Sequence, residues 1–407
     1  GESTSDTVFG AHQLIGEHGA LLGEKRFEHG LLISEIDVQK LCYERRRTQM
    51  MDQVPELTGS PFSLTVSKTK LTRYVAPMPF VPEGKEDRDE RCREILLIAS
   101  LGLKQRLEHT GAKTAVVGLS GGLDSTLAVL IAGLAMKMLD RPMTDIVAVT
   151  MPCFGTTDRT KSNAIIVSEQ LGATVRVIDI GESVMQHFKD IGHDMEDHSV
   201  TFENAQARER TQVLMDIANQ NGGIVIGTGD LSELALGWCT YNGDHMSMYA
   251  VNASIPKTLV RYMVESYAQE QREQGNTALA DTLLDICDTP VSPELLPPTS
   301  EGVIVQKTEE TIGSYDLHDF FLYHLLRNHF APRKIYALAK IAFSDRDPSL
   351  ILSTLKTFYR RFFTQQFKRN CMPDGVKVGS VCLSPRGDWR MPSDASFALW
   401  MNELEEL

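Results

Sequence analysis

The stretch VVGLSGGLDSTLAV, Val116–Val129, joins an apolar run to a glycine-rich loop and then to a helical pattern. A short apolar run that ends in glycines predicts a buried strand, and the helix is predicted to begin at Asp124. The stretch contains G-x-S-x-G at Gly118, Ser120 and Gly122, the pattern of a hydrolase nucleophile elbow. It also has the form of a loop that holds phosphate at a helix N-terminus. The two interpretations give Ser120 different chemistry.

Outward from this stretch, apolar runs alternate with helical patterns. Strands are predicted at 114–119, 145–152, 174–180 and 222–229, and helices at 124–138, 159–172 and 204–220. Strands separated by helices predict an α/β fold, a doubly wound parallel sheet with helices on both faces. Ligands of such sheets lie beyond the carboxyl ends of the strands. The glycine-rich loop, MPCFGT (151–156) and GTGDLSE (227–233) should therefore cluster.

The composition excludes several classes of protein. The 407 residues are 42% hydrophobic and 23% charged, which is typical of globular proteins and long enough for two or three domains. The net charge of −13 argues against a nucleic-acid partner. Seven cysteines without a C-x-x-C pair argue against a disulfide framework and a structural zinc site, and favour a cytoplasmic location. The longest uncharged apolar run, 127–136, is too short to span a bilayer, so we expect no membrane partner.

The ends of the chain are less regular than its middle. Residues 1–60 predict short strands, with a hairpin signature in LIGEHGALLGEKRFEHGLLISEIDV, and are too few to close a core alone. A helix with one apolar face is predicted over 87–109. The segment 287–302 carries four prolines and predicts a loop. Helices are predicted over 317–341 and 346–367, and the last forty residues are punctuated by glycine and proline.

The phosphate interpretation suits the residues of SGGLDS best. Gly121 and Gly122 let backbone N–H groups approach oxygen atoms, and the hydroxyls of Ser120 and Ser125 flank them. The loop lacks the G-K-[ST] ending of a Walker A motif. Asp124 at the helix start would repel bare phosphate, so its presence favours Mg²⁺ between carboxylate and phosphate.

The elbow interpretation needs an acid and then a histidine later in the chain. Asp285 or Asp288, followed by His318, His324 or His329, could supply them, but no motif surrounds any of these residues. The three histidines fall in or beside a predicted helix, where we expect them on the surface. A tight strand–helix turn without function is the third interpretation.

SGGLDS resembles the pyrophosphate-binding loop of the ATP-pyrophosphatase (PP-loop) superfamily. The run GTGDLSELALGWCTYNGDHMSMYAVNASIPKTLVR (227–261) resembles the NAD synthetases of that superfamily, and so do FENAQARERT (202–211) and QFKRNCMPDG (366–375). The resemblance covers most of residues 86–407. It implies a Rossmann-like fold of the adenine-nucleotide alpha-hydrolase type, with ATP as co-substrate. The family makes NAD from deamido-NAD: ATP adenylates the nicotinate carboxylate, pyrophosphate leaves, and ammonia displaces AMP.

The resemblance implies two sets of binding residues and no certain catalytic residue, because the family relies on positioning and electrostatics. ATP-binding positions are Ser120, Gly121, Gly122, Asp124, Ser125 and Thr228, and Mg²⁺-binding positions are Asp124 and Glu233. Without the resemblance, Asp124 would be a helix N-cap and Thr228 a strand-end hydroxyl.

Positions that match deamido-NAD contacts are Asn204, Arg208, Trp238, Asp244, Lys257 and Lys368. The first two often reach the site across a dimer, which implies a homo-oligomer. The alternatives are a solvated helix face for 208–210, a turn at Asp244, a surface lysine at 257 and a core aromatic at 238. Arg369 is a less certain neighbour of Lys368, and Arg210 is expected on the solvated face. Segments 151–160 and 289–302 resemble the family's two mobile loops.

Residues 1–75 resemble the end of a nitrilase-like amidase (glutaminase) domain. The resemblance divides the chain into this β-rich remnant, a linker over 76–90 and a synthetase domain over 91–407. The amidase nucleophile, a cysteine with a glutamate and a lysine, is expected upstream of Gly1, since Cys42 in KLCYERRR matches no nucleophile motif. We therefore expect free ammonia to serve this chain and glutamine to serve the full-length enzyme, with the missing amidase portion as a partner. A docked extension is the alternative for residues 1–60.

Three other functions stay open on the residues alone. One is another PP-loop ATP-dependent amidotransferase, and one is an α/β-hydrolase that uses Ser120. The third is a regulatory module that binds a nucleotide without cleaving it. The cluster HDMEDH (193–198) offers metal-capable side chains, but without a helical i, i+4 pair it predicts a polar loop.

Overall fold

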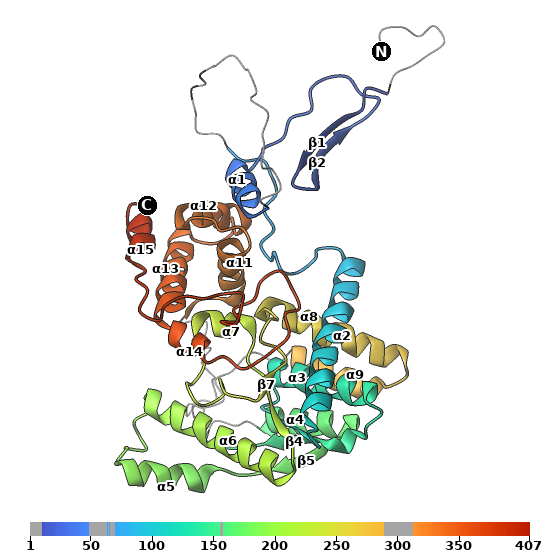
Figure 1. Ribbon diagram of the computed structural model, residues 1–407, viewed down its shortest axis with the longest axis vertical. Helices are drawn as coiled ribbons and strands as arrows, with labels where there is room; N and C mark the ends of the chain where they lie inside the picture. Colours follow the sequence, from blue (N-terminus) through green and yellow to red (C-terminus); the bar gives the residue numbers. More distant parts are fainter. Residues whose placement is uncertain (1–9, 49–62, 64, 66–69, 155–157, 289–311) are drawn as a thin grey trace.

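A five-stranded parallel sheet lies in the lower part of the molecule as drawn in Figure 1. The computed structural model describes residues 10–48, 63, 65, 70–154, 158–288 and 312–407. The strands are β3 (Ala115–Gly118), β4 (Ile146–Thr150), β5 (Thr174–Val177), β6 (Ile224–Gly227) and β7 (Tyr249–Ala250), in the order β5-β4-β3-β6-β7. The predicted doubly wound α/β fold is confirmed.

Alternation along the strands explains why helices cover both faces of the sheet. Ala115 and Val117 of β3 face one hydrophobic core, and Val116 between them faces another. Successive strand residues point to opposite faces, so a strand that is apolar throughout needs two layers of helices. The first core is closed by α2 (Lys85–Thr110), α3 (Leu123–Met138), α4 (Asp158–Leu171), α8 (Lys257–Glu273) and α9 (Thr277–Cys287), and the second by α5 (Gly181–Ile191) and α6 (Val200–Gln220).

The strand order places a switch point between β3 and β6. From β3 the chain winds outward through β4 and β5, and it then returns to the opposite side of β3 as β6. The connections after β3 and β6 therefore leave the sheet side by side and in opposite directions, which opens a crevice at the carboxyl edge. The loop at 119–122 and the segment 228–230 both lie there.

The helices predicted over 87–109, 124–138 and 204–220 are confirmed as α2, α3 and α6. Because α2 begins at Lys85, the last residues of the predicted 76–90 linker are helical. The single helix predicted over 317–341 is wrong: α11 (Tyr315–Leu326) and α12 (Pro332–Ala342) are separate. Ala331 is extended before Pro332, as residues before proline prefer, so the helix cannot run through.

The predicted 346–367 helix corresponds to α13 (Pro348–Thr364) and the start of α14 (Gln366–Asn370). The last forty residues are irregular up to α15 (Ala398–Glu405). These helices pack with α11, α12 and α7 (Leu231–Leu236) around a third hydrophobic core that is rich in phenylalanine. This core lies beside the carboxyl edge, so it supports one wall of the crevice.

The N-terminal hairpin is confirmed as antiparallel β1 (Gln13–Glu17) and β2 (Ala20–Lys25), which turn at His18 and Gly19. The helix α1 (Val38–Arg47) follows it. Figure 1 shows both at the opposite end of the molecule from the sheet. Helix α1 is tied to the α11–α12 pair by ion pairs, Glu44 to Arg327 at 2.8 Å and Asp37 to Lys334 at 2.6 Å.

The expectation that His318 and His324 lie on a helix surface is wrong. Both are buried on α11, His318 with 1% exposure, among aromatic rings that include Phe320 and Phe358. The imidazole of His318 hydrogen-bonds the carbonyl of Ile312 at 2.8 Å. Burial lowers the pKa of each to about 4. His329 is exposed and lies beyond the end of α11.

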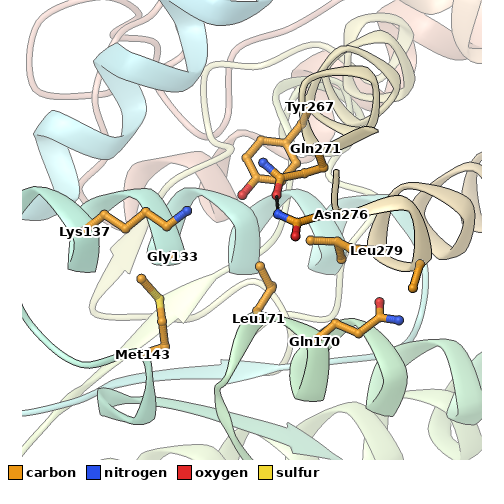
Figure 2. A pocket seen from close by; sticks show the side chains of 10 residues that line it. Gly133, Lys137, Met143, Gln170, Leu171, Tyr267, Gln271, Asn276 and Leu279 are labelled. Carbon is orange, nitrogen blue, oxygen red and sulfur yellow. Dashed lines mark hydrogen bonds between the residues drawn. The ribbon is translucent and has the colours of Figure 1, made fainter. Parts of the chain in front are cut away.

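A pocket of about 240 Å³ lies among α3, α4, α8 and α9 (Figure 2). Its lining includes Lys137, Gln170, Tyr267 and Gln271, none of which was predicted as a site residue. Lys137 stands 13 residues beyond Asp124 on the same helix, which is about 20 Å along its axis. This pocket is therefore separate from the crevice at the strand ends.

No helix in the described part of the chain is long and apolar enough to cross a membrane. All seven cysteines fall in that part, and each is a free thiol. The fold is thus held by its three hydrophobic cores without a covalent cross-link among these residues.

The buried His318 predicts an acid-sensitive contribution to stability. Its pKa is about 4 in the folded protein and near 6.5 when unfolded, so the unfolded state binds more protons between these values. The free energy of unfolding of the wild type should fall, relative to that of His318→Gln, by up to about 3 kcal/mol from pH 6.5 to pH 4.

Urea unfolding of both proteins at several pH values measures this difference. The comparison with the variant is needed because Asp319, whose pKa burial raises to about 6, titrates with the opposite effect on stability. The exposed His109, replaced by glutamine, is the matched control for a histidine-to-glutamine change. A constant difference between wild type and His318→Gln over this range would contradict the prediction.

Candidate active site

The loop between β3 and α3 folds around its own hydroxyl groups. The backbone N–H of Gly122 donates to Ser120 Oγ at 3.2 Å, and the N–H of Ser120 lies 3.3 Å from Ser125 Oγ. Ser125 Oγ in turn donates to the carbonyl of Gly122 at 3.1 Å. Gly121 has φ +87°, a left-handed conformation that side chains disfavour, so the sharp turn needs glycine there.

Helix α3 presents an open N-terminus at this loop. Its N-cap residue is Gly122, which offers no side chain to the first N–H groups of the helix. Those groups, with the helix dipole, favour an anion. Asp124 is the second helical residue and not the N-cap, so the capping role considered for it does not apply. Its carboxylate oxygen Oδ1 is buried without a hydrogen-bond partner.

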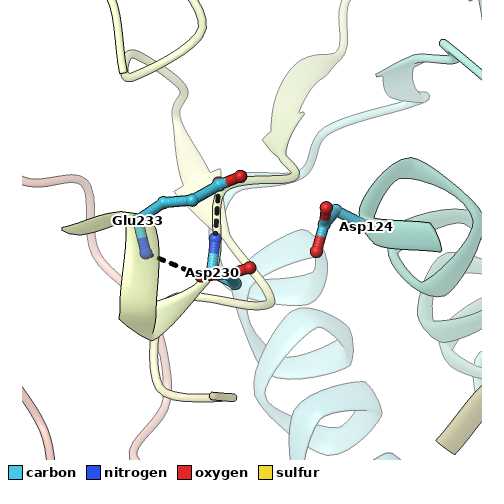
Figure 3. A group of neighbouring side chains, drawn as sticks. All are labelled: Asp124, Asp230 and Glu233. Carbon is cyan, nitrogen blue, oxygen red and sulfur yellow. Dashed lines mark hydrogen bonds between the residues drawn. The ribbon is translucent and has the colours of Figure 1, made fainter. Parts of the chain in front are cut away.

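Helix α7 brings two more carboxylates to the crevice from the end of β6. Asp230 is the N-cap and accepts from the N–H of Glu233 at 2.8 Å, while the Glu233 carboxylate accepts from the N–H of Asp230 at 3.3 Å. This reciprocal capping box fixes both side chains at the helix start. Figure 3 shows the pair facing Asp124. Ligand oxygens of all three lie within 4.8 Å of one another.

Lys257, the first residue of α8, completes this group. Its Nζ lies 2.6 Å from Asp124 Oδ2, 2.7 Å from Asp230 Oδ2 and 2.9 Å from Glu233 Oε1. The Lys257 side chain is only 14% exposed, and that of Asp230 is fully buried. We name these four residues the carboxylate–lysine cluster. It joins α3, α7 and α8 at the switch point of the sheet.

The cluster shifts the protonation of its own members. Burial raises the pKa of Glu233 to about 7, against the opposing effect of the lysine charge. Burial also raises the pKa of Asp230 well above its usual value. Burial alone would lower the pKa of Lys257, but the surrounding carboxylates hold it well above its usual value. Asp230 and Glu233 therefore hold protons more readily than ordinary carboxyl groups, and a further bound cation would favour their ionised form instead.

Asn252 links the two halves of the site, and nothing in its sequence context singled it out. It is fully buried, and its side-chain amide donates to the backbone carbonyls of Asp124 at 2.9 Å and Thr228 at 3.0 Å. These carbonyls belong to the connections after β3 and β6. Asn252 therefore sets the spacing between the phosphate-type loop and the start of α7.

A second buried carboxylate supports the cluster from behind. Asp319 of α11 accepts from Ser232 Oγ and, at 2.7 Å, from Thr258 Oγ1. The Ser232 hydroxyl accepts from the N–H of Lys257 at 2.9 Å. This network connects α7, α8 and α11, and it places the residues that follow Asp230 and Lys257. No local pattern marked Asp319, because its partners lie far away in the sequence.

A third set of predicted residues gathers around the turn at 240–244. Thr240 donates through its hydroxyl to Asn204 Oδ1 at 2.7 Å and through its N–H to Asp244 Oδ1 at 2.7 Å. Arg208 is exposed on α6 and donates to the carbonyl of Tyr241 at 3.2 Å. The structure thus brings Asn204, Arg208 and Asp244 together around this turn.

The remaining predicted residues surround the carboxyl end of α7. Lys368 Nζ donates to the carbonyls of Gly237 at 2.8 Å and Cys239 at 2.6 Å. Trp238 is half-buried and lies under the guanidinium of Arg361. Arg369 is fully buried and donates to the carbonyl of Ala235 at 2.8 Å, so its contacts are structural. Cations near the last carbonyls of a helix are stabilising.

The structure gives Ser120 no catalytic partner of the hydrolase type. Its hydroxyl lies 3.0 Å from Ser125 Oγ and accepts from Gly122, and no histidine within the described ranges hydrogen-bonds it. The buried His318 and His324 lie among the aromatic rings of the third core. The geometry favours the phosphate interpretation of the loop.

Other predicted features add little to the site. HDMEDH is an exposed loop closed by its own hydrogen bonds, and the three carboxylates near Lys257 are the one metal-capable group of three in the described ranges. Of the two mobile-loop segments, 155–157 and 289–302 lie outside the described residues. Arg210 is half-buried on α6, so the solvated face expected for it holds only in part.

Comparison with known proteins agrees with this geometry. The family model described as NAD synthase matches residues 97–346. The glutamine-dependent NAD(+) synthetase of Mycobacterium tuberculosis H37Rv is 40% identical over 442 residues, which cover 100% of this chain and 64% of that protein. The protein of the same name from Mycobacterium leprae is 40% identical and is covered to 65%. This chain thus spans about two thirds of the length of these relatives.

Among solved structures, a glutamine-dependent NAD(+) synthetase from Cytophaga hutchinsonii has the same fold, with a TM-score of 0.61 at 19% identity. The alignment covers 77% of this chain and 56% of the other. The family match includes β3 to β7 and the carboxylate–lysine cluster. The chain therefore belongs to the NAD synthase family.

Proposed function

We propose that this chain catalyses the ATP-dependent amidation of deamido-NAD (nicotinate adenine dinucleotide) to NAD. The observation that carries the proposal is the meeting of Asp124, Asp230 and Glu233 beside the open N-terminus of α3. A loop that can hold phosphate and a group of carboxylates stand on the two sides of the switch point. This arrangement suits a metal-bound nucleoside triphosphate.

The reaction has two group transfers. A nicotinate carboxylate oxygen attacks the α-phosphorus of ATP, and the bond to the bridging oxygen breaks, so pyrophosphate leaves. The nitrogen of ammonia then attacks the acyl carbon, loses a proton and expels AMP. The chain's residues bind and orient: Ser120, Gly121, Gly122, Ser125 and Thr228 for ATP, with the N–H groups of α3 aimed at phosphate oxygens.

The carboxylate–lysine cluster fits Mg²⁺. Its donors are hard oxygen atoms from Asp124, Asp230 and Glu233, and one oxygen of Asp124 is buried without a partner. Bound there, Mg²⁺ would neutralise charge on the leaving pyrophosphate. Asp230 extends the pair Asp124 and Glu233 that the sequence resemblance indicated.

The deamido-NAD site of the proposal uses Asn204, Arg208 and Asp244 around the 240–244 turn, and Trp238, Lys257 and Lys368 near α7. In the structure Lys368 is held by the carbonyls of Gly237 and Cys239. We propose that it exchanges them for substrate oxygens. The exposed Arg208 offers a guanidinium that can bind phosphate in two contacts.

We assign residues 1–75 to the end of a nitrilase-like amidase domain and 91–407 to the synthetase domain. The matches to relatives extend over the whole chain and beyond the family model. Leu31 and Ile33 are 85% and 82% exposed, as expected if a further part of the protein covers them. In this proposal the amidase portion frees ammonia from glutamine, and these 407 residues use ammonia. We further propose a homo-oligomer in the cytoplasm, consistent with seven free thiols.

The variants Asp124→Asn and Glu233→Gln test the cluster. Each removes a charged oxygen ligand, so AMP formation from ATP, Mg²⁺, deamido-NAD and ammonium should fall by about 100-fold or more. AMP is quantified by chromatography. The exposed Asp394→Asn and Glu405→Gln are matched controls that should keep wild-type rates. Full AMP formation in both cluster variants would contradict the assignment.

The nitrogen donor is tested with isotopes. We expect ¹⁵N from ammonium to appear in the carboxamide of NAD, with one AMP formed for each NAD, while [amide-¹⁵N]glutamine gives no labelled NAD with these residues. Mass spectrometry measures both. Transfer from glutamine would contradict the ammonia assignment. AMP formation with another carboxylate but not with deamido-NAD would instead indicate a different amidotransferase.

Asn252→Asp tests the bridge between the two halves of the site. The change replaces the side-chain NH₂ group that donates to the carbonyls of Asp124 and Thr228 with a carboxylate oxygen, which repels these carbonyls. We expect a loss of about 1–3 kcal/mol in the free energy of unfolding and weaker ATP binding. Denaturant unfolding and calorimetric titration measure the two effects. The exposed Asn402→Asp is the control, and equal behaviour of the two variants would count against the bridge.

A further inference from the structure

The ammonium group of Lys257 lies among the three carboxylates that are proposed to bind a metal cation. Its Nζ lies within 2.9 Å of one oxygen from each of Asp124, Asp230 and Glu233. Those three side chains belong to α3 and α7, whereas Lys257 belongs to α8. The ammonium group therefore links the three helices through charge.

The cluster has three carboxyl groups and one ammonium, and ligand oxygens of all three carboxyl groups lie within 4.8 Å of one another. Asp230 is fully buried, so water does little to screen a charge on it. Without the ammonium, ionised carboxylates would repel one another at short range, and the groups would hold protons instead. Lys257 thus favours the ionised form of the cluster when no other cation is bound.

The oxygens that Lys257 contacts are also the metal-capable ones. Lys257 contacts one oxygen of each of these carboxylates, and a carboxylate held by the ammonium has less charge to offer a divalent cation at the same time. One further contact is available to the lysine, because its Nζ lies 5.3 Å from the ring centre of Tyr315. The lysine side chain has a flexible four-carbon stem, so its ammonium can move while α8 stays in place.

We propose that Lys257 is a tethered cation that holds the carboxylates closed to free divalent metal and releases them when a nucleotide binds. The ammonium then moves from the carboxylates to the anionic oxygens of the ligand. Binding of metal and binding of nucleotide are thereby coupled, since each favours the same displaced position of Lys257. The inference rests on the proposed function only in taking a nucleoside triphosphate as the ligand.

Mn²⁺ binding, measured by electron paramagnetic resonance with MnCl₂ alone, tests the proposal without any turnover. We expect Lys257→Met to bind Mn²⁺ at least tenfold more tightly than the wild type in the absence of nucleotide. Lys257→Arg keeps the charge and should bind Mn²⁺ as weakly as the wild type. Equal affinities of Lys257→Met and the wild type, within about twofold, would overturn the proposal.

A second measurement covers the case in which Lys257→Met does not fold. In the wild type, the protein and a non-hydrolysable ATP analogue together should bind Mn²⁺ at least tenfold more tightly than expected from the separate Mn²⁺ affinities of the protein and of the analogue. Additive binding would overturn the proposal. Deamido-NAD is absent from both titrations. A failure of the proposed amidation would therefore appear in the turnover assays, whereas a failure of the tethered-cation role would appear here.

Discussion

The carboxylate–lysine cluster is the interaction on which the proposed site depends. It collects one carboxylate from the connection after β3 and two from the connection after β6, and a lysine of α8 neutralises part of their charge. Parallel strands deliver their carboxyl ends to one edge, and the switch in strand order opens that edge. The fold thus determines where the proposed site lies, and the charged side chains support the proposed binding of a metal-bound nucleotide there.

Buried polar residues hold this edge at a fixed spacing. Asn252 ties the backbone of the two connections together, and Asp319 fixes the residues that flank the cluster from the side of α11. Cations bind the other end of α7, where Gly237 has φ +57° and a side chain would collide with Gln365. Helix α7 has only six residues, so these contacts at both ends, more than its own hydrogen bonds, keep Glu233 in place.

Local sequence predicted the sheet, because apolar strands and the residues that end them lie close together in the chain, whereas the pairing of Asp124 with Glu233 was implied by the resemblance to the NAD synthetases. It could not reveal Asn252 or Asp319, whose partners are separated from them by dozens of residues. It also placed His318 on a surface. The sequence of a helix does not show how many of its sides other elements cover, and α11 is covered on nearly all sides. The break before Pro332 follows from the preference of a residue before proline for extended backbone, which the helical pattern over 317–341 does not express.

The proposed function depends on activation of a carboxylate by ATP at this edge of the sheet. The most direct measurement is the exchange of labelled pyrophosphate into ATP, with deamido-NAD and Mg²⁺ present and every nitrogen donor withheld. Formation of an acyl-adenylate predicts exchange that depends on deamido-NAD. Retained ATP binding without any exchange, or cleavage of ATP to ADP, would contradict it.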